Sequence, residues 1–272
     1  MDIALAFDEG YATYAHVTIE SILQSHTHRD DLTLWLLTPA GLQARVADAF
    51  RRQIEDRAHA RFLTADDGFR SMPIAQQEQY RYISAGMYLR LFLPDLVPPD
   101  LTRLLYLDCD TIVGGDLGGL FARPMGGAPL GAVRDGFTLS MGHEGGVPGA
   151  GMHVSRRAPY FNSGVLLMNL PVWREAGVTE GCFEYLRAHH DRLRFPDQDA
   201  LNLVTYGRWH QLESKWNDTI LWWMWPGDPR AARYVAITHF LGPRKPWQSD
   251  FPYAGYRERY LELAGRVAEL TA

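Results

Sequence analysis

The sequence predicts an α/β fold with a Rossmann-like, mostly parallel sheet flanked by helices. Over the first 65 residues, short apolar runs alternate with amphipathic stretches. Strands are expected at 2–7, 32–38 and 60–65, with a helix after each of the first two. Because a strand–helix–strand order places successive strands side by side through right-handed crossovers, this half of the chain should form a parallel layer.

Side-chain periodicity defines the individual elements. The first helix is expected from apolar residues at helical spacing, namely Tyr11, Ala15, Ile19, Ile22 and Leu23. The second helix is expected to begin at Pro39, since proline is favoured in the first turn of a helix. Further along the chain, a helix is expected over 83–94 and buried strands over 103–107, 130–135 and 160–170.

Composition and charge restrict the classes of function. Of the 272 residues, 46% are hydrophobic and 22% are charged, as in a globular protein. The formal charge of −5 argues against nucleic acid as a partner, because a phosphate backbone needs a basic face. Two cysteines, no signal peptide and no apolar stretch of about 20 residues predict a cytoplasmic protein without a transmembrane segment. At most, we expect peripheral association with the inner face of a membrane.

Carboxylates follow three of the expected strands. Asp8 follows the first, Asp108 and Asp110 follow the strand at 103–107, and Asp135 ends the strand at 130–135. If these strands are parallel neighbours, the carboxylates converge on one crevice at the carboxyl end of the sheet, where ligands bind in such folds.

Asp108 and Asp110 are two residues apart, so in an extended chain they face the same way and suit a divalent cation. The alternative is an acidic turn after a strand. A D-x-D pattern is weak by itself, and the chain has a second one at 197–199.

Four motifs in fixed order carry a family resemblance. The motifs LYLDCDTIV, FNSGVLLMNL, PDQDALN and THFLGPRKPW resemble those of the retaining glycosyltransferases of family 8, and the similarity covers residues 1–247. The resemblance implies one glycosyltransferase domain of the GT-A fold over 1–272. Residues 1–115 would be its nucleotide-binding half, 116–247 its acceptor and catalytic half, and 248–272 a C-terminal helix.

The resemblance also implies a metal and diphosphate site. Asp108, Asp110 and His239 match the residues that hold Mn²⁺, or Mg²⁺, against the diphosphate of a UDP-sugar. From the residues alone, the favoured interpretation of His239 is that it packs after its strand. Gly242 and Lys245 match positions that contact the diphosphate, since glycine admits close backbone approach and an ammonium stabilises departing charge.

Further positions match the family's donor contacts. Ala6 and Asp8 match residues that hold uracil and ribose, although Gly10 stands where the family usually has asparagine. Cys109 is expected to turn its backbone to the nucleotide and its side chain away from the metal. The remaining donor contacts are Arg90, near the sugar and phosphates, and Asn162, an amide suited to sugar hydroxyls. A helix-surface salt bridge is the alternative for Arg90.

Asp197 and Gln198 match the pair beside the anomeric carbon. Asp197 could also cap a helix. Because an amide is a poor nucleophile, we expect a front-face substitution that moves galactose or glucose from the UDP-sugar to a glycan or glycolipid hydroxyl with retention. A nucleotide-sugar hydrolase and a non-catalytic nucleotide-sugar-binding protein are the alternatives.

The acceptor side is the least defined. The glycine-rich segment 142–152 could form a flap over it. Asp135, Trp222 and Trp223 are the candidate acceptor contacts, although burial in the core is the default interpretation of the two tryptophans.

Overall fold

The protein is described by a computed structural model that covers residues 1–272 except 27–30, 40, 42–43, 66–84, 220–234 and 272. The predictions for Trp222 and Trp223 therefore lie outside the described residues. Within the described parts, no helix is both long enough and apolar enough to cross a membrane.

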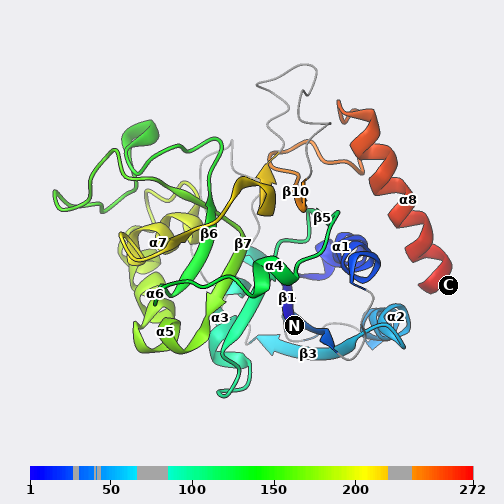
Figure 1. Ribbon diagram of the computed structural model, residues 1–272. Coiled ribbons are helices and arrows are strands. Elements are labelled where there is room, and N and C mark those ends of the chain that lie inside the picture. Colours follow the sequence, from blue (N-terminus) through cyan, green and yellow to red (C-terminus); the bar gives the residue numbers. More distant parts are fainter. Residues whose placement is uncertain (27–30, 40, 42–43, 66–84, 220–234, 272) are drawn as a thin grey trace.

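Seven strands of the described chain form the central sheet in the order β3-β2-β1-β4-β7-β6-β8 (Figure 1). Their bounds are β1 Asp2–Ala6, β2 Thr33–Pro39, β3 His59–Ala65, β4 Arg103–Leu107, β6 Leu130–Arg134, β7 Phe161–Asn169 and β8 His210–Gln211. Strand β1 pairs in parallel with β2 and β4, so Ile3 lies opposite both Leu34 and Leu105. Strand β7 runs antiparallel to its two neighbours, β4 and β6. The predicted mostly parallel α/β sheet is confirmed, with β7 as its reversed member.

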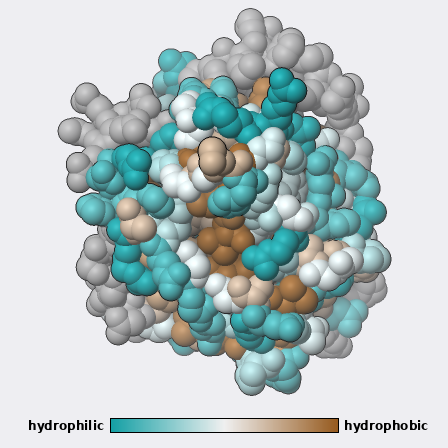
Figure 2. Space-filling model, turned by 90° about the vertical axis from the view of Figure 1, so that its left-hand side faces the viewer, coloured by the Kyte–Doolittle hydropathy of each residue, from teal (hydrophilic) through white to brown (hydrophobic). Residues whose placement is uncertain are grey.

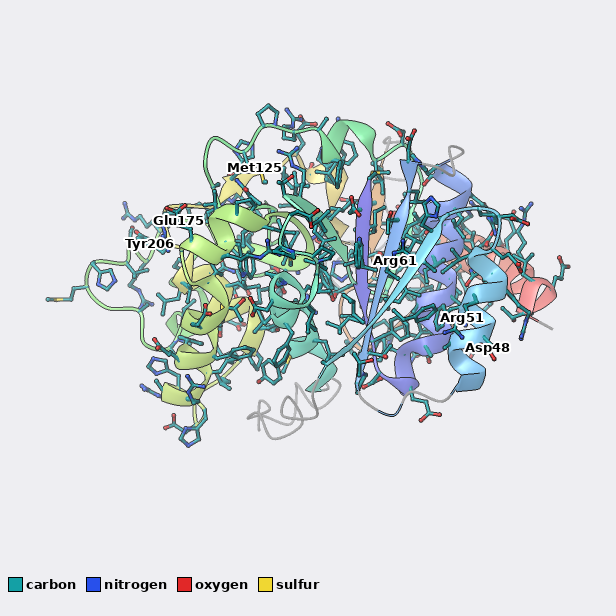
Figure 3. All side chains as sticks on the ribbon, turned by 90° about the horizontal axis from the view of Figure 1, so that it is seen from below. Asp48, Arg51, Arg61, Met125, Glu175 and Tyr206 are labelled. Carbon is teal, nitrogen blue, oxygen red and sulfur yellow. The ribbon has the colours of Figure 1, made fainter. Side chains whose placement is uncertain are left out.

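Both faces of the sheet are covered, which explains the continuous apolar runs in its strands. In β4, Leu104 and Tyr106 pack into one core, whereas Leu105 and Leu107 pack into the other. The first core also contains α3 Leu89–Leu96, α5 Leu170–Glu175, α6 Val178–Ala188 and α7 Pro196–Val204. The second contains α1 Ala12–Ser25, α2 Ala44–Ile54 and α4 Gly118–Phe121. Figure 3 shows these helices on opposite sides of the sheet, with Arg51 on α2 and Glu175 at the end of α5.

A small second sheet lies at the carboxyl end of the first. It consists, over the described residues, of β5 Thr111–Val113, β10 Ile237–His239 and β9 Asp218–Thr219, in the order β5-β10-β9. The last helix, α8 Ala254–Thr271, packs on α1 and α2 through a face that includes Tyr260, Leu263 and Val267. Short 3₁₀ helices lie at Glu9–Tyr11, Ala85–Tyr88, His143–Gly145 and Ser214–Trp216.

Two expected helix starts differ from the structure. Pro39 ends β2 opposite Ala65, and α2 begins only at Ala44. Pro39 lacks an N–H to donate, but the end of a strand tolerates this as well as a first helical turn does. The helix expected over 83–94 is described only from residue 85, where it is a 3₁₀ turn at Ala85–Tyr88 followed by α3, which continues through Pro94 to Leu96.

Candidate active site

The acidic residues predicted to converge line one pocket of about 570 Å³ at the carboxyl ends of β1, β4 and β6. The order of the strands that brings these residues together differs in part from the expected one. Strand β6 is not a neighbour of β4, because β7 lies between them; since β7 is antiparallel to both, β4 and β6 still point the same way. The reversal also brings the amino-terminal end of β7, with Asn162 and Ser163, into the same pocket.

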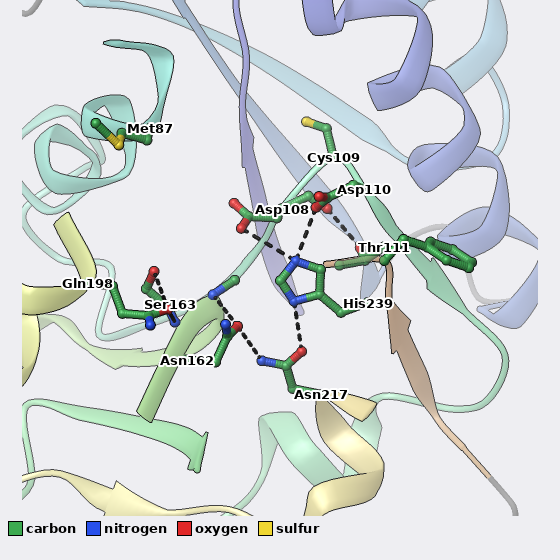
Figure 4. Close-up of polar contacts among 12 residues, drawn as sticks. Met87, Asp108, Cys109, Asp110, Thr111, Asn162, Ser163, Gln198, Asn217 and His239 are labelled. Atoms are coloured by element: carbon green, nitrogen blue, oxygen red, sulfur yellow. Dashed lines mark hydrogen bonds and ion pairs between the residues drawn. The ribbon is translucent and has the colours of Figure 1, made fainter. Parts of the chain in front are cut away.

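Asp108, Asp110 and His239 form a cluster that could hold a metal ion. One ligand atom from each lies within 4.8 Å of the others. The His239 Nε2 atom is 3.2 Å from Asp110 Oδ1 and 3.8 Å from Asp108 Oδ2 (Figure 4). The small sheet creates this arrangement, because pairing of β10 with β5 places His239 opposite Thr111, one residue after Asp110.

A buried amide fixes the orientation of the His239 ring. Asn217 Oδ1 lies 3.0 Å from His239 Nδ1, and Asn217 Nδ2 donates to Asn162 Oδ1 at 2.9 Å. An amide oxygen only accepts, so Nδ1 carries the proton and Nε2 is left as the atom that faces the carboxylates. Sequence reasoning missed Asn217, since its partners are 22 and 55 residues away and no local pattern marks it.

Lys245 lies beside the acidic cluster. Its ammonium is 2.7 Å from Asp110 Oδ2 and donates to the Phe240 carbonyl at 2.5 Å. Burial by itself raises the pKa of Asp110, but Lys245 and His239 outweigh this effect and hold that pKa well below its ordinary value. Asp110 is therefore an ionised carboxylate at neutral pH.

Arg90 is buried between two carboxylates and does not form the alternative surface salt bridge. Its guanidinium is 2.8 Å from Asp108 Oδ1 and 3.2 Å from Asp197 Oδ2, and it donates to the Ser163 carbonyl at 2.9 Å. Burial alone would lower the pKa of Arg90, but the neighbouring carboxylates, chiefly Asp108, raise it. Tyr106, which sequence reasoning also missed, donates to Asp108 Oδ1 at 2.5 Å.

Asp197 and Gln198 lie in the first turn of α7, buried in the pocket wall. Phe195 is the capping residue, so Asp197 does not act as the N-cap; its carboxylate accepts a bond from Ser163 Oγ at 3.2 Å. Burial raises the pKa of Asp197, and Arg90 opposes that rise. Gln198 Oε1 accepts a bond from the Ser163 backbone N–H at 2.9 Å.

Asp135 holds the opposite wall together. Its Oδ1 accepts from the N–H groups of Phe137 at 2.8 Å and Thr138 at 2.6 Å. Its Oδ2 accepts from Asn162 Nδ2 at 3.0 Å and Gln198 Nε2 at 3.3 Å. Both carboxylate oxygens are thus engaged, and the structure joins Asp135, Asn162 and Gln198 in one network.

The other predicted donor contacts also lie at the pocket. Cys109 donates its thiol to the Ala6 carbonyl at 3.7 Å, and Figure 4 shows its sulfur pointing away from His239. Asp8 Oδ1 caps the following turn by accepting from the Tyr11 N–H at 3.1 Å. Gly242 lines the pocket with a φ of 84°, a conformation that favours glycine.

The segment that carries Gly242 and Lys245 is anchored by an aromatic stack. Trp247 stacks on Tyr14 of α1, with ring centroids 3.7 Å apart and an interplanar angle of 13°. Its other contact is Tyr260 of α8, at a centroid distance of 5.4 Å. The wall of the pocket that Gly242 and Lys245 form therefore depends on packing against α1 and α8.

Gly164→Ala is expected to lower activity by about a hundredfold, because displacing an active-site group by about 1 Å has an effect of that size. A Cβ atom at Gly164 would lie 2.2 Å from His239 Cε1 and 2.8 Å from Asp108 Oδ2. Gly265→Ala in α8, where a Cβ meets nothing within 4 Å, is the matched control. Steady-state turnover would be measured for both variants. Equal activity of Gly164→Ala and Gly265→Ala would show that the His239 ring and the Asp108 carboxylate can move aside without loss.

Known proteins resemble this chain in sequence and structure. General stress protein A of Bacillus subtilis is 30% identical over 66% of this chain, and the match spans 64% of its own length. The match to glycosyltransferase GlyA of Streptococcus pneumoniae spans 23% of that protein, so the chain covers less than two thirds of these relatives. The lipopolysaccharide 1,2-glucosyltransferase of Escherichia coli K12 is 26% identical over 96% of this chain and 78% of its own.

The solved structures include galactosyltransferase LgtC in complex with donor and acceptor sugar analogs. It matches 98% of this chain and 96% of its own with a TM-score of 0.78 and 28% identity. An active-site mutant of LgtC covers the same shares with a TM-score of 0.83 and 29% identity. This likeness confirms the expected GT-A fold. The sequence model for glycosyl transferase family 8 matches residues 2–250, and the chain therefore belongs to that family.

Proposed function

We propose that this glycosyltransferase moves galactose or glucose from a UDP-sugar to a hydroxyl group of a glycan or glycolipid, with retention of configuration and with Mn²⁺ or Mg²⁺. The observation that supports the proposal is that two groups of charged residues, one around His239 and one around Arg90, meet in one pocket. Asp108 belongs to both, since it approaches His239 on one side and Arg90 on the other. Arg90 in turn reaches Asp197, next to Gln198.

The residues present fit a divalent cation. Asp108, Asp110 and His239 offer two carboxylates and an imidazole whose Nε2 faces them, a donor set that suits Mn²⁺. When bound, such an ion supplies Lewis-acid stabilisation of a leaving diphosphate. The neighbouring Asn217 contributes by holding the imidazole in the orientation needed for binding.

The remaining pocket residues would bind the donor. Lys245 and the backbone at Gly242 would hold the diphosphate, since an ammonium and an open backbone suit phosphate oxygens. Ala6, Asp8 and the Cys109 backbone would contact uracil and ribose at the ends of β1 and β4. Arg90 would fix Asp108 and Asp197 in place, because it is bonded to both.

Retention by front-face attack fits the side chains around Gln198. Gln198 is an amide and would stabilise positive charge at the anomeric carbon through its carbonyl oxygen. Asp197 is engaged by Arg90 and Ser163, and would bind sugar hydroxyls. Asp199 is fully buried and bonded to Arg194 and Tyr160, which leaves it poorly placed as a nucleophile. The acceptor hydroxyl would pass its proton to the departing phosphate oxygen. A glycosyl adduct trapped on Asp197 or Asp199 would contradict this route.

A screen of UDP release tests the proposal. UDP-Gal, UDP-Glc, UDP-GlcNAc and UDP-GalNAc would be offered with manganese or with EDTA, alone and with lactose, free sugars or lipid-linked sugars as acceptors. We expect release with a UDP-hexose to need metal and to accelerate with an acceptor. Release that no acceptor accelerates would indicate a nucleotide-sugar hydrolase, and absence of release with every donor would indicate a binding protein.

A further inference from the structure

The wall of the pocket away from Lys245 is formed by the excursion 135–160, which joins β6 to β7 and projects as a green loop in Figure 1. Phe137, Thr138 and Glu144 of this excursion line the pocket, together with Phe195 at the start of α7. Figure 2 views the molecule from this side, where the surface is mostly hydrophilic around a central hydrophobic hollow. This wall is where an acceptor would approach a donor held by the opposite wall.

Glu144 has an unusual backbone conformation. Its φ of 47° and ψ of 50° lie in the left-handed region, which non-glycine residues adopt at a cost of about 1 kcal/mol or more. The residues on either side are held by hydrogen bonds. Arg194 donates to the His143 carbonyl at 2.9 Å, and Arg156 donates to the Gly145 carbonyl at 3.3 Å. The turn therefore presents Glu144 in a defined position at the pocket.

Arg194 also ties this turn to the catalytic helix. Its guanidinium lies 3.0 Å from Asp199 Oδ1, and the Asp199 side chain has no solvent exposure. Asp199 follows Gln198 directly in the first turn of α7. The position of Glu144 is thereby coupled to that of Gln198 through one arginine, which acts as a positioning residue.

The charged residues of the pocket bear on what kind of acceptor could lie beside Glu144. Among the described residues, the Glu144 carboxylate has no hydrogen-bond or ion-pair partner and is exposed to the pocket. The arginine and the lysine among the described lining residues are Arg90 and Lys245. Arg90 is already paired with Asp108 and Asp197, and Lys245 is already paired with Asp110. Among the described lining residues, an acceptor that carried a negative charge would therefore meet the Glu144 carboxylate and no unpaired lysine or arginine.

We propose that Glu144 is a specificity-determining residue that accepts hydrogen bonds from acceptor hydroxyl or ammonium groups and disfavours acceptors that carry an acidic group beside the reacting hydroxyl. This inference rests on the proposed transferase function and adds the class of acceptor. The carboxylate would accept charge-assisted hydrogen bonds from the hydroxyl groups of a neutral sugar, whereas a uronic acid or sugar phosphate would place like charges together.

The test compares matched acceptors within each variant. Methyl galactoside and methyl galacturonoside, and methyl glucoside and methyl glucuronoside, are pairs that differ only in the group at C6, and they would be assayed by product formation with the preferred UDP-hexose. We expect the wild type to favour each neutral acceptor by about tenfold or more in kcat/KM. In Glu144→Gln this ratio should fall towards one, and in Glu144→Lys it should favour the acidic acceptor. Using a ratio removes any general loss of activity.

Glu184→Lys provides the matched control, since Glu184 is exposed on α6 and does not line the pocket. Its ratio should equal that of the wild type. An unchanged ratio in Glu144→Lys, or loss of transfer to both acceptors in Glu144→Gln, would overturn the proposal. If the wild type releases UDP but transfers to no glycoside, the proposed transferase function fails first, and the specificity role fails with it.

Discussion

Replacing Asp110 with asparagine is expected to lower kcat/KM for transfer by about a thousandfold or more, because metal and phosphate stabilisation of a leaving group provides several kcal/mol. The Asp110 carboxylate approaches both His239 Nε2 and Lys245 Nζ, at 3.2 and 2.7 Å. An amide of the same shape keeps the volume but removes the negative charge that both neighbours face. Manganese-dependent UDP release in the presence of an acceptor measures the effect.

Asp116→Asn serves as the control for this change. Asp116 is exposed, lies outside the pocket and accepts a hydrogen bond from the Gly118 N–H, a bond that an amide oxygen can also accept. Its activity should match that of the wild type. If the Asp110→Asn enzyme kept a tenth of the wild-type kcat/KM, Asp110 could not be a metal ligand as proposed.

Arg90→Met is expected to reduce the free energy of unfolding by about 3–5 kcal/mol, the usual effect of removing one partner from a buried ion pair. The change leaves Asp108 and Asp197 facing each other across an apolar side chain, without the cation that is 2.8 and 3.2 Å from them. Urea unfolding with EDTA present measures the change without a contribution from metal. Arg187→Met, on the exposed face of α6, is the control and should change stability little.

The stability defect of Arg90→Met should also depend on pH. Burial already raises the pKa of Asp197 above its ordinary value, and Arg90 opposes this rise, so its loss raises that pKa further. A carboxyl group with a raised folded-state pKa favours the folded state when protonated, and that contribution is lost as pH increases. The defect should therefore be larger at pH 7.5 than at pH 5.5. A loss of unfolding free energy that is equal at the two pH values would show that the ionisation of Asp197 does not cause the defect.

The layers of the fold could be predicted from the sequence because local patterns determine them. The runs DIALAF and RLLYL are short, apolar and followed by acids and glycines, which identifies buried strands and the edge where ligands bind. The direction of β7 could not be predicted in this way, since an apolar run reads the same in a parallel and an antiparallel strand. Yet the reversal of β7 is what delivers Asn162 and Ser163 to the pocket.

The candidate site likewise contains residues that a local sequence pattern identifies and residues that only the fold brings together. Asp108 and Asp110 are close in sequence, so spacing alone makes them a plausible pair. His239 was identified only through the family resemblance, because the strand pairing that brings it to Asp110 spans more than a hundred residues. Asn217 and Arg194 act through His239 and His143, which lie 22 and 51 residues away from them in the sequence. Residues whose role is to hold another residue leave no pattern in a single sequence.

Trp247 packs between Tyr14 and Tyr260, so it connects the pocket segment that carries Lys245 to helix α8. Opening the segment around Lys245 requires separating these rings, so that segment and α8 should unfold locally as one cooperative unit. A nucleotide sugar bound by Lys245, as proposed, would then protect α8 from proteases by mass action, although no described residue of that helix lines the pocket. Conversely, anything that loosens α8 would weaken the proposed binding of a donor by Lys245, which makes that helix a remote determinant of substrate saturation.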